Sequence, residues 1–170
     1  MTVAMELVGV RVDMPSNTPV LLLREQDGER RVLAIMIGGP EAQAIAFALD
    51  GVETRRPMTH DLLITMIEEL GAQVERITIT ALRDEVFYAD LVLQAHGDTH
   101  IVSARPSDAM ALAVRIGTPV FAEESVLAAV GYIEVEDDDD SDDDDAPSAD
   151  EMVEEFREFI DQVNPEDFAS

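Results

Sequence analysis

The chain has 170 residues, of which 46% are hydrophobic, and it contains neither cysteine nor tryptophan. This is enough for one domain with a hydrophobic core, while the lack of cysteine excludes disulfides, thiolate metal sites and thiol nucleophiles. No basic segment precedes an apolar run at the N-terminus, and no apolar stretch approaches the ~18 residues of a membrane span. We therefore expect a cytoplasmic protein with no membrane partner.

The net charge of −26 is unevenly distributed. Residues 1–135 hold 20 acidic and 10 basic residues, a net of −10, and residues 136–170 hold 17 acidic and one basic, a net of −16. Every basic residue is an arginine. Proteins that grip phosphate backbones usually show a basic face, so any binding of DNA or RNA has to rest on a local arginine cluster and is expected to be weak.

The first third of the chain predicts a strand, a hairpin and a helix. Valines alternate with other residues over 5–12, which indicates a strand, and apolar runs at 19–24 and 30–37 flank a turn at 26–29. A Gly-Gly-Pro break at 38–40 then begins a helix. The expected buried positions of this helix are Ala42, Ile45, Ala46 and Leu49.

The middle of the chain predicts a second helix and an antiparallel meander. Thr59 is a suitable N-cap for a helix that ends at Gly71. The expected buried stripe of this helix is Leu63, Met66, Ile67 and Leu70. The meander that follows turns at residues 84–85 and 97–98, and its last strand ends at Arg105.

Residues 102–112 are the most informative stretch. A strand stops at Pro106, Ser107 is a good N-cap, and Asp108 places a carboxylate in the first helical turn, where the helix dipole favours negative charge. The expected buried positions of this helix are Ala109, Leu112, Ala113 and Ile116. Arg105 and Asp108 thus share a strand-to-helix corner, where polar chemistry is often placed, although a capped helix with a surface ion pair would use the same residues.

The order of the elements predicts an α+β fold. After the third helix come a short strand at 119–122 and a short helix at 125–130. An acidic-Ala-x-Ala-aliphatic-Ala pattern occurs at 41–46 and again at 108–113, each time after a hairpin and a proline. We expect a mostly antiparallel or mixed sheet packed with three to four helices. The repeated pattern indicates either a duplicated hairpin–helix unit, in which Glu41 takes the place of Asp108, or a chance recurrence of alanine-rich helices.

The composition predicts a folded domain over residues 1–135, an acidic disordered linker over 136–147 and a short helix with its tail over 148–170. The apolar stripe of the C-terminal helix is Met152, Val153, Phe156, Phe159, Ile160 and Val163. So short a helix is marginal alone in water, so we expect residues 148–163 to dock on the domain, on a second copy or on a protein partner. We also expect the tail to mimic nucleic acid, so that cutting after Val135 raises activity or binding.

Three separated stretches resemble the bifunctional nuclease family of DNase/RNase-like domains. They are residues 35–38 followed by Glu41-Ala42, residues 56–63, and residues 104–109 with the helix that follows. The resemblance covers about residues 3–133. It implies a compact α+β fold, pairing into dimers, and nuclease activity on DNA and RNA, but it supplies no assigned catalytic residue.

The resemblance extends to the tail and has two departures. Residues 153–168 resemble the extension of actinobacterial members. Many members have Asp at the position of Ser103 and Trp at the position of Met36, so this chain has no carboxylate at the strand end before Arg105.

Polar side chains gather where the matching motifs start helices. Cleavage of a phosphodiester needs an activated water and a cationic group that stabilises the crowded phosphorus centre. The candidate catalytic residues are Glu41, His60, Asp61 and Asp108, and the candidate phosphate-binding residues are Arg56 and Arg105. Asp61 and Asp108 are the candidate ligands of a Mg²⁺ or Mn²⁺ ion.

Each candidate also has a purely structural interpretation. The acids would stabilise the helix dipoles. The arginines would pair with those acids, which would hold the loops in place and leave the charges of the site neutralised. Two hypotheses follow: a nuclease acting on DNA or RNA, and a non-catalytic regulatory module that recruits a protein partner through the helix of residues 148–163. The motifs favour the nuclease, while the net charge favours the module.

Overall fold

The computed structural model of the protein describes residues 1–133. The predicted acidic linker and C-terminal helix lie outside the described residues, as does the docking of that helix. None of the described helices is longer than 11 residues, which is too short and not apolar enough to cross a membrane.

Eight strands form one mixed sheet in the order β6-β5-β4-β7-β1-β2-β3-β8. The strands are β1 (Thr2–Asp13), β2 (Thr18–Glu25), β3 (Arg31–Met36), β4 (Ala72–Arg83), β5 (Val86–Ala95), β6 (Asp98–Ala104), β7 (Val120–Glu123) and β8 (Tyr132–Ile133). All neighbours pair antiparallel except β4 and β7, which are parallel. The predicted α+β class is confirmed.

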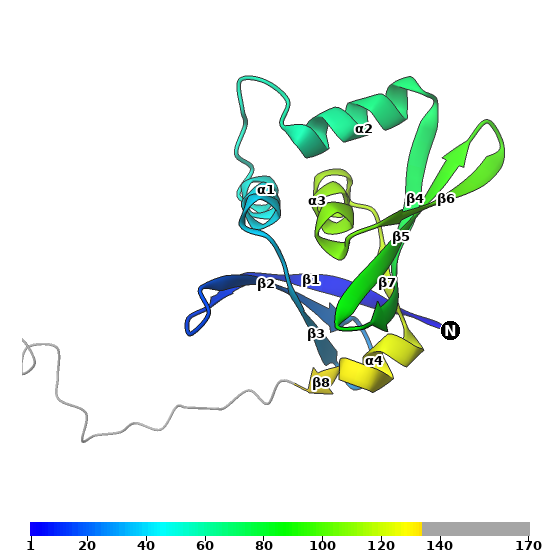
Figure 1. Ribbon diagram of the computed structural model, residues 1–170. Coiled ribbons are helices and arrows are strands. Elements are labelled where there is room, and N and C mark those ends of the chain that lie inside the picture. Colours follow the sequence, from blue (N-terminus) through cyan, green and yellow to red (C-terminus); the bar gives the residue numbers. More distant parts are fainter. Residues whose placement is uncertain (134–170) are drawn as a thin grey trace, which may run out of the picture. The chain divides into compact units, whose positions relative to one another are not determined.

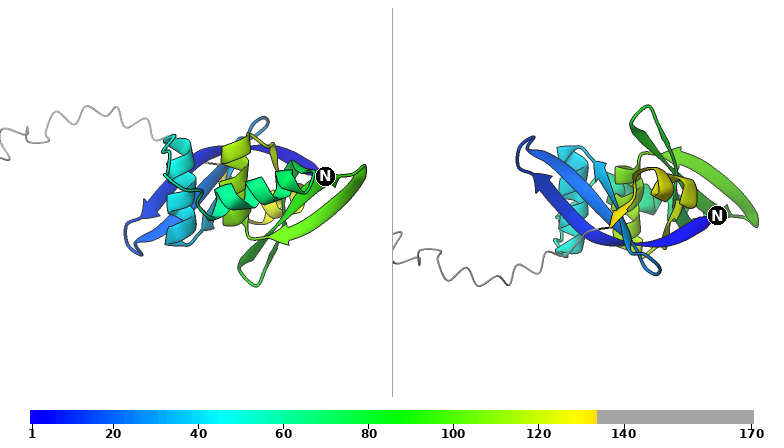
Figure 2. Two further views of the ribbon diagram at one scale, coloured as in Figure 1. Left: turned by 90° about the horizontal axis from the view of Figure 1, so that it is seen from above. Right: turned by 90° about the horizontal axis from the view of Figure 1, so that it is seen from below.

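Four helices accompany the sheet: α1 (Gly39–Leu49), α2 (Thr59–Glu69), α3 (Pro106–Ile116) and α4 (Glu124–Val130). The twisted sheet curves around α3, with α1 beside it (Figure 1). Helix α2 crosses over α3 as a further layer, which is clearest from above (Figure 2).

The chain contains two similar halves. Strands β1, β2 and β3 form a meander that leads into α1, and strands β4, β5 and β6 form a meander that leads into α3. Strand β7 joins the two meanders by pairing with β4 on one side and with β1 on the other. This arrangement agrees with the predicted duplicated unit and explains why α1 and α3 lie as neighbours.

The core lies between the sheet and the helices. Its largest fully buried side chains are Met5, Leu21, Leu23, Val32, Leu33, Ile45, Ile77, Ile79, Met110 and Leu127. They come from β1, β2, β3, β4, α1, α3 and α4, so both halves contribute to one hydrophobic cluster. Burying an aliphatic side chain contributes about 1.5–3 kcal/mol, so this shared core fixes α1 against α3.

The predicted stripe of α2 is wrong in three of its four positions. Leu63, Met66 and Leu70 are 40%, 53% and 70% exposed. Helix α2 is an outer layer that contacts α3 and β4, and the face that packs inward is the narrower one carrying His60 and Ile64.

The structure also differs from the sequence-based predictions at the ends of the helices. Leu49 and Ile116, expected in the core, are 51% and 38% exposed, because each ends its helix. Met58 rather than Thr59 is the N-cap residue of α2, and Arg105 rather than Ser107 is that of α3. The residue before a proline is held in extended conformation, and Pro106 therefore begins α3 two residues earlier than the capping preference of serine suggests.

Candidate functional site

The first turns of α1 and α3 meet at one corner of the molecule. Glu41 is the third residue of α1, and Asp108 is the third residue of α3. Both face Arg105, whose extended backbone (φ −72°, ψ 144°) caps α3. The neighbouring packing of α1 and α3 thus brings together two acids that are 67 positions apart in the chain.

Arg105 bridges the two carboxylates. Its Nε donates to Asp108 Oδ2 at 2.7 Å, and its Nη2 donates to Asp108 Oδ1 at 3.0 Å and to Glu41 Oε1 at 2.7 Å. The Nη1 atom makes no hydrogen bond with any described residue. Since the Arg105 side chain is 66% exposed, the two N–H groups of Nη1 can reach a ligand.

His60 on α2 lies behind this bridge. Its Nε2 is 3.2 Å from Asp108 Oδ1, and its side chain is 9% exposed against 30% for that of Asp108. The carboxylate is therefore in front, toward solvent, and the imidazole supports it from the interior. Glu41, His60, Asp108 and Arg105 together form what we call the arginine corner.

The arginine corner favours the ionised form of Asp108. Partial burial opposes ionisation, but the hydrogen bonds from Arg105 and His60 outweigh it and hold the Asp108 pKa below its usual value. Hydrogen bonds to Asp108 and Glu41 raise the pKa of Arg105 further above neutrality. The pair therefore stays charged throughout the neutral range.

Gly38 allows Glu41 to take its place in the corner. A Cβ atom at Gly38 would lie only 2.2 Å from Glu41 Oε2, so any larger residue displaces that carboxylate. The backbone of Gly38 (φ −73°, ψ 152°) is one that any residue adopts. The glycine is thus needed here for space and not for conformation, which makes it a positioning residue that the sequence analysis missed.

An open groove of about 390 Å³ borders Arg105. One wall is the end of β3 with Met36 and Ile37, and the other is the start of β5 with Val86 and Phe87. Apolar walls with a guanidinium at the rim suit a ligand that has both an apolar body and an anionic group.

Asp61 lies outside the arginine corner. Its Oδ1 accepts from Arg115 Nε at 2.6 Å, and its Oδ2 accepts from the backbone N–H of Met58 at 2.8 Å. Chiefly because of the Arg115 hydrogen bond, the pKa of Asp61 is below its usual value. Asp61 therefore caps α2 and ties it to α3, which matches the structural interpretation of its place in the sequence.

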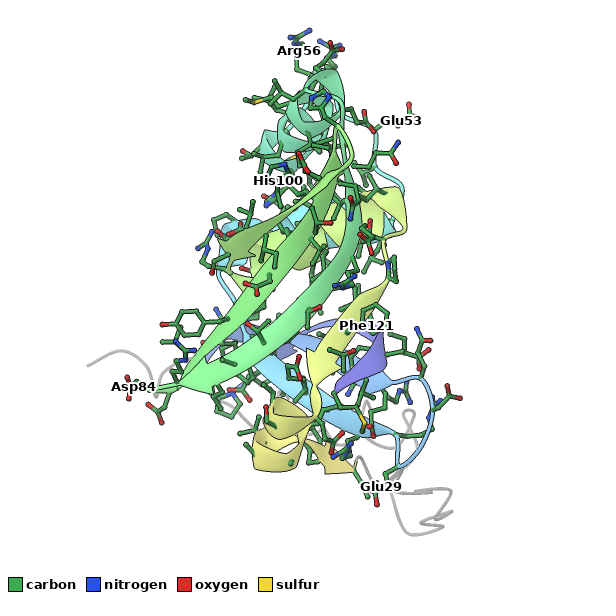
Figure 3. All side chains as sticks on the ribbon, turned by 90° about the vertical axis from the view of Figure 1, so that its right-hand side faces the viewer. Glu29, Glu53, Arg56, Asp84, His100 and Phe121 are labelled. Atoms are coloured by element: carbon green, nitrogen blue, oxygen red, sulfur yellow. The ribbon has the colours of Figure 1, made fainter. Side chains whose placement is uncertain are left out.

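Arg56 also lies apart. Its side chain forms no ion pair or hydrogen bond with the described residues. Figure 3 shows Arg56 projecting from the top of the domain, near Glu53, while Asp84 lies far below it at the left. The groove is lined by Glu85, the neighbour of Asp84, so Arg56 and the groove are widely separated.

The acids do not form a ready metal site. Within residues 1–133, no three His, Cys, Asp or Glu side chains are arranged to hold a metal ion. Asp61 and Asp108, the candidate ligands, are each occupied by a different arginine. The side chains present at the corner thus do not fit a divalent ion as they stand.

Comparison with known proteins identifies the family. The model of the bifunctional nuclease domain matches residues 21–134, a span that includes Glu41, His60, Asp108 and Arg105. The chain belongs to the bifunctional nuclease family. The resemblance inferred from the three sequence motifs is therefore confirmed.

Bifunctional nuclease relatives occur in bacteria and plants. An uncharacterised protein of Mycobacterium tuberculosis is 47% identical over 163 residues, which cover 95% of each chain. Bifunctional nuclease 2 of Oryza sativa is 30% identical over 132 residues, which cover 75% of this chain but 40% of the rice protein. Bifunctional nuclease 1 of Arabidopsis thaliana is 29% identical over 105 residues, which cover 60% of this chain and 32% of the plant protein.

Proposed function

We propose that this protein hydrolyses phosphodiester bonds in DNA or RNA at the arginine corner. The observation that carries the proposal is the gathering of acids from two helices and a histidine from a third around one guanidinium, whose Nη1 makes no hydrogen bond within residues 1–133. This guanidinium borders an open groove of about 390 Å³. Membership of the bifunctional nuclease family supports the same reaction.

Three members of the corner, Arg105, Asp108 and His60, have a role in the proposed reaction. Arg105 Nη1 donates to a non-bridging phosphate oxygen and stabilises the negative charge that grows as water attacks phosphorus. Water forms the new bond to phosphorus, one ester bond breaks, and solvent protonates the departing oxygen. Asp108 accepts the proton lost by water, and His60 holds the Asp108 carboxylate in place.

The test is a cleavage assay on fluorescent single-stranded DNA and RNA oligonucleotides, with Mg²⁺, Mn²⁺ or EDTA. We expect Asp108→Ala, His60→Ala and Arg105→Ala to lower kcat/KM by about 10²-fold or more, the usual size of an acid–base or electrostatic contribution. Asp98→Ala, which removes an exposed carboxylate at the start of β6, is the matched control.

All variants are purified identically and compared by circular dichroism. Cleavage that persists unchanged in both Asp108→Ala and Arg105→Ala would show that another site or a contaminating nuclease is responsible. An equal loss in Asp98→Ala would also contradict the assignment.

The alternative function is a non-catalytic binding module. The exposed apolar face of α2 favours it, because large apolar groups at 40–70% exposure are common where proteins associate. In that case the three corner variants would change neither cleavage nor the affinity for oligonucleotides.

A further inference from the structure

The guanidinium of Arg105 occupies the point between the two corner acids. Its Nη2 is 2.7 Å from Glu41 Oε1 and 3.0 Å from Asp108 Oδ1. A metal ion ligated by both carboxylates would have to lie at about this point, because hard divalent ions bind carboxylate oxygens at about 2.0–2.6 Å.

Three of the four carboxylate oxygens are already engaged. Asp108 accepts through both oxygens from Arg105, and its Oδ1 also faces His60. Glu41 accepts from Arg105 through Oε1. A divalent ion ligated by both carboxylates at this point can enter only if it displaces the guanidinium and its charge-assisted hydrogen bonds.

The charge of the guanidinium is permanent. The two acids raise the pKa of Arg105, so no accessible pH releases the carboxylates by deprotonating it. With Nε and Nη2 committed to the acids, Nη1 remains directed away from them, toward a ligand.

We propose that Arg105 is a built-in substitute for a divalent metal ion, holding Glu41 and Asp108 in place and presenting its own positive charge to the phosphate. The reaction part rests on the proposed nuclease function, whereas the part concerning metal binding does not.

The decisive experiment is a Mn²⁺ titration of the full chain followed by electron paramagnetic resonance. We expect acidic residues elsewhere, above all in 136–145, to bind some Mn²⁺, so the wild type is compared with Glu41→Gln/Asp108→Asn, which lacks only the two corner charges. We expect the same number of bound Mn²⁺ ions in both. One more ion in the wild type than in the double variant would overturn the proposal.

Removing the guanidinium supplies the second measurement. Arg105→Ala should gain a Mn²⁺ site relative to the wild type, and Arg105→Ala/Asp108→Asn should lose it again. Arg105→Lys, which keeps the positive charge, should not gain it. Failure of a folded Arg105→Ala to gain a site would also contradict the proposal, and the wild-type comparison is decisive even if this variant does not fold.

Measurements of cleavage activity give an independent test of the inference. If the protein cleaves oligonucleotides, EDTA should leave the wild-type rate unchanged, while Mn²⁺ should partly restore cleavage by Arg105→Ala. Loss of wild-type cleavage in EDTA would overturn the inference. If no condition gives cleavage, the proposed function fails, and the Mn²⁺ titrations still decide the question of metal binding.

Discussion

At the scale of single residues, Arg105 combines two roles that compete with each other. It neutralises part of the charge of Glu41 and Asp108, and it offers Nη1 to a ligand. The three side chains together carry a net charge of −1, so a phosphate that approaches Nη1 is attracted by one group and repelled by two. This balance agrees with the expectation of weak nucleic-acid binding.

Glu41→Gln should therefore strengthen oligonucleotide binding. Removing a like charge about 5 Å from a phosphate relieves about 0.8 kcal/mol in water, or roughly a fourfold change in affinity. Fluorescence anisotropy at several salt concentrations measures this effect. The control is Glu53→Gln, which removes the same charge near Arg56, at the end of the molecule away from the groove.

The comparison separates a local effect from one of net charge. If Glu41→Gln and Glu53→Gln tighten binding equally, the phosphate does not bind at Arg105. If neither changes binding, the corner is not part of the nucleic-acid interface.

At the scale of the elements, arginines also connect secondary structures far from the corner. Arg31 at the start of β3 donates to both oxygens of Glu25 at the end of β2, at 2.7 and 3.0 Å. It also donates to both oxygens of Glu124 on α4, at 2.9 and 3.0 Å. The Glu25 side chain is 4% exposed, so this cluster joins the hairpin to α4 from a largely buried position.

Arg31→Ala should destabilise the fold by about 3 kcal/mol, because it leaves the Glu25 carboxylate buried without a cation. Urea unfolding followed by circular dichroism measures the free energy of unfolding. Arg76→Ala is the control, since Arg76 pairs with Glu75 on the surface, where an ion pair contributes about 0–1 kcal/mol. Equal losses in the two variants would contradict a special role for the buried pair.

The buried Arg31–Glu25 pair also predicts that the free energy of unfolding depends on pH. The hydrogen bond from Arg31 lowers the pKa of Glu25 in the folded protein, so the stabilisation is present above the ordinary carboxyl value of about 4.3 and is lost as pH falls below it. The wild type should lose stability on acidification through this range. Arg31→Ala should lose less, because the interaction is already absent.

At the scale of the whole molecule, a net charge of −26 coexists with an exposed apolar face on α2. Leu62, Leu63, Met66 and Leu70 are all at least 40% exposed on this one short helix and the residue after it. An apolar face of this kind can be buried against the same face of a second copy in a twofold dimer. We propose that two copies associate through α2.

Met66→Glu should prevent this association. Sedimentation equilibrium should show a wild-type dimer that strengthens with added salt, because salt screens the repulsion between two strongly acidic chains. Met14→Glu, which adds the same charge at an exposed position between β1 and β2, should dimerise like the wild type. A monomeric wild type at all concentrations, or unchanged association of Met66→Glu, would contradict the proposal.

The local parts of the fold were predictable from the sequence because their causes are local. Two apolar runs that flank a glycine-containing turn predicted the β2–β3 hairpin, which the structure confirms. Gly117, with φ 69°, ends α3 as expected of a left-handed cap. The exposure of Leu63 and Met66 was not predictable in this way, because periodicity identifies an apolar face but not whether another element covers it.

What the sequence by itself determined is that three helices each begin with an acid in the first turn: Glu41, Asp61 and Asp108. Only the tertiary structure decided which of them share a partner. Helices α1 and α3 pack as neighbours with their first turns together, so Glu41 and Asp108 meet on Arg105, whereas α2 crosses over α3 and pairs Asp61 with Arg115. Helix starts are set by a few adjacent residues, while the meeting of side chains depends on the packing of elements far apart in the chain.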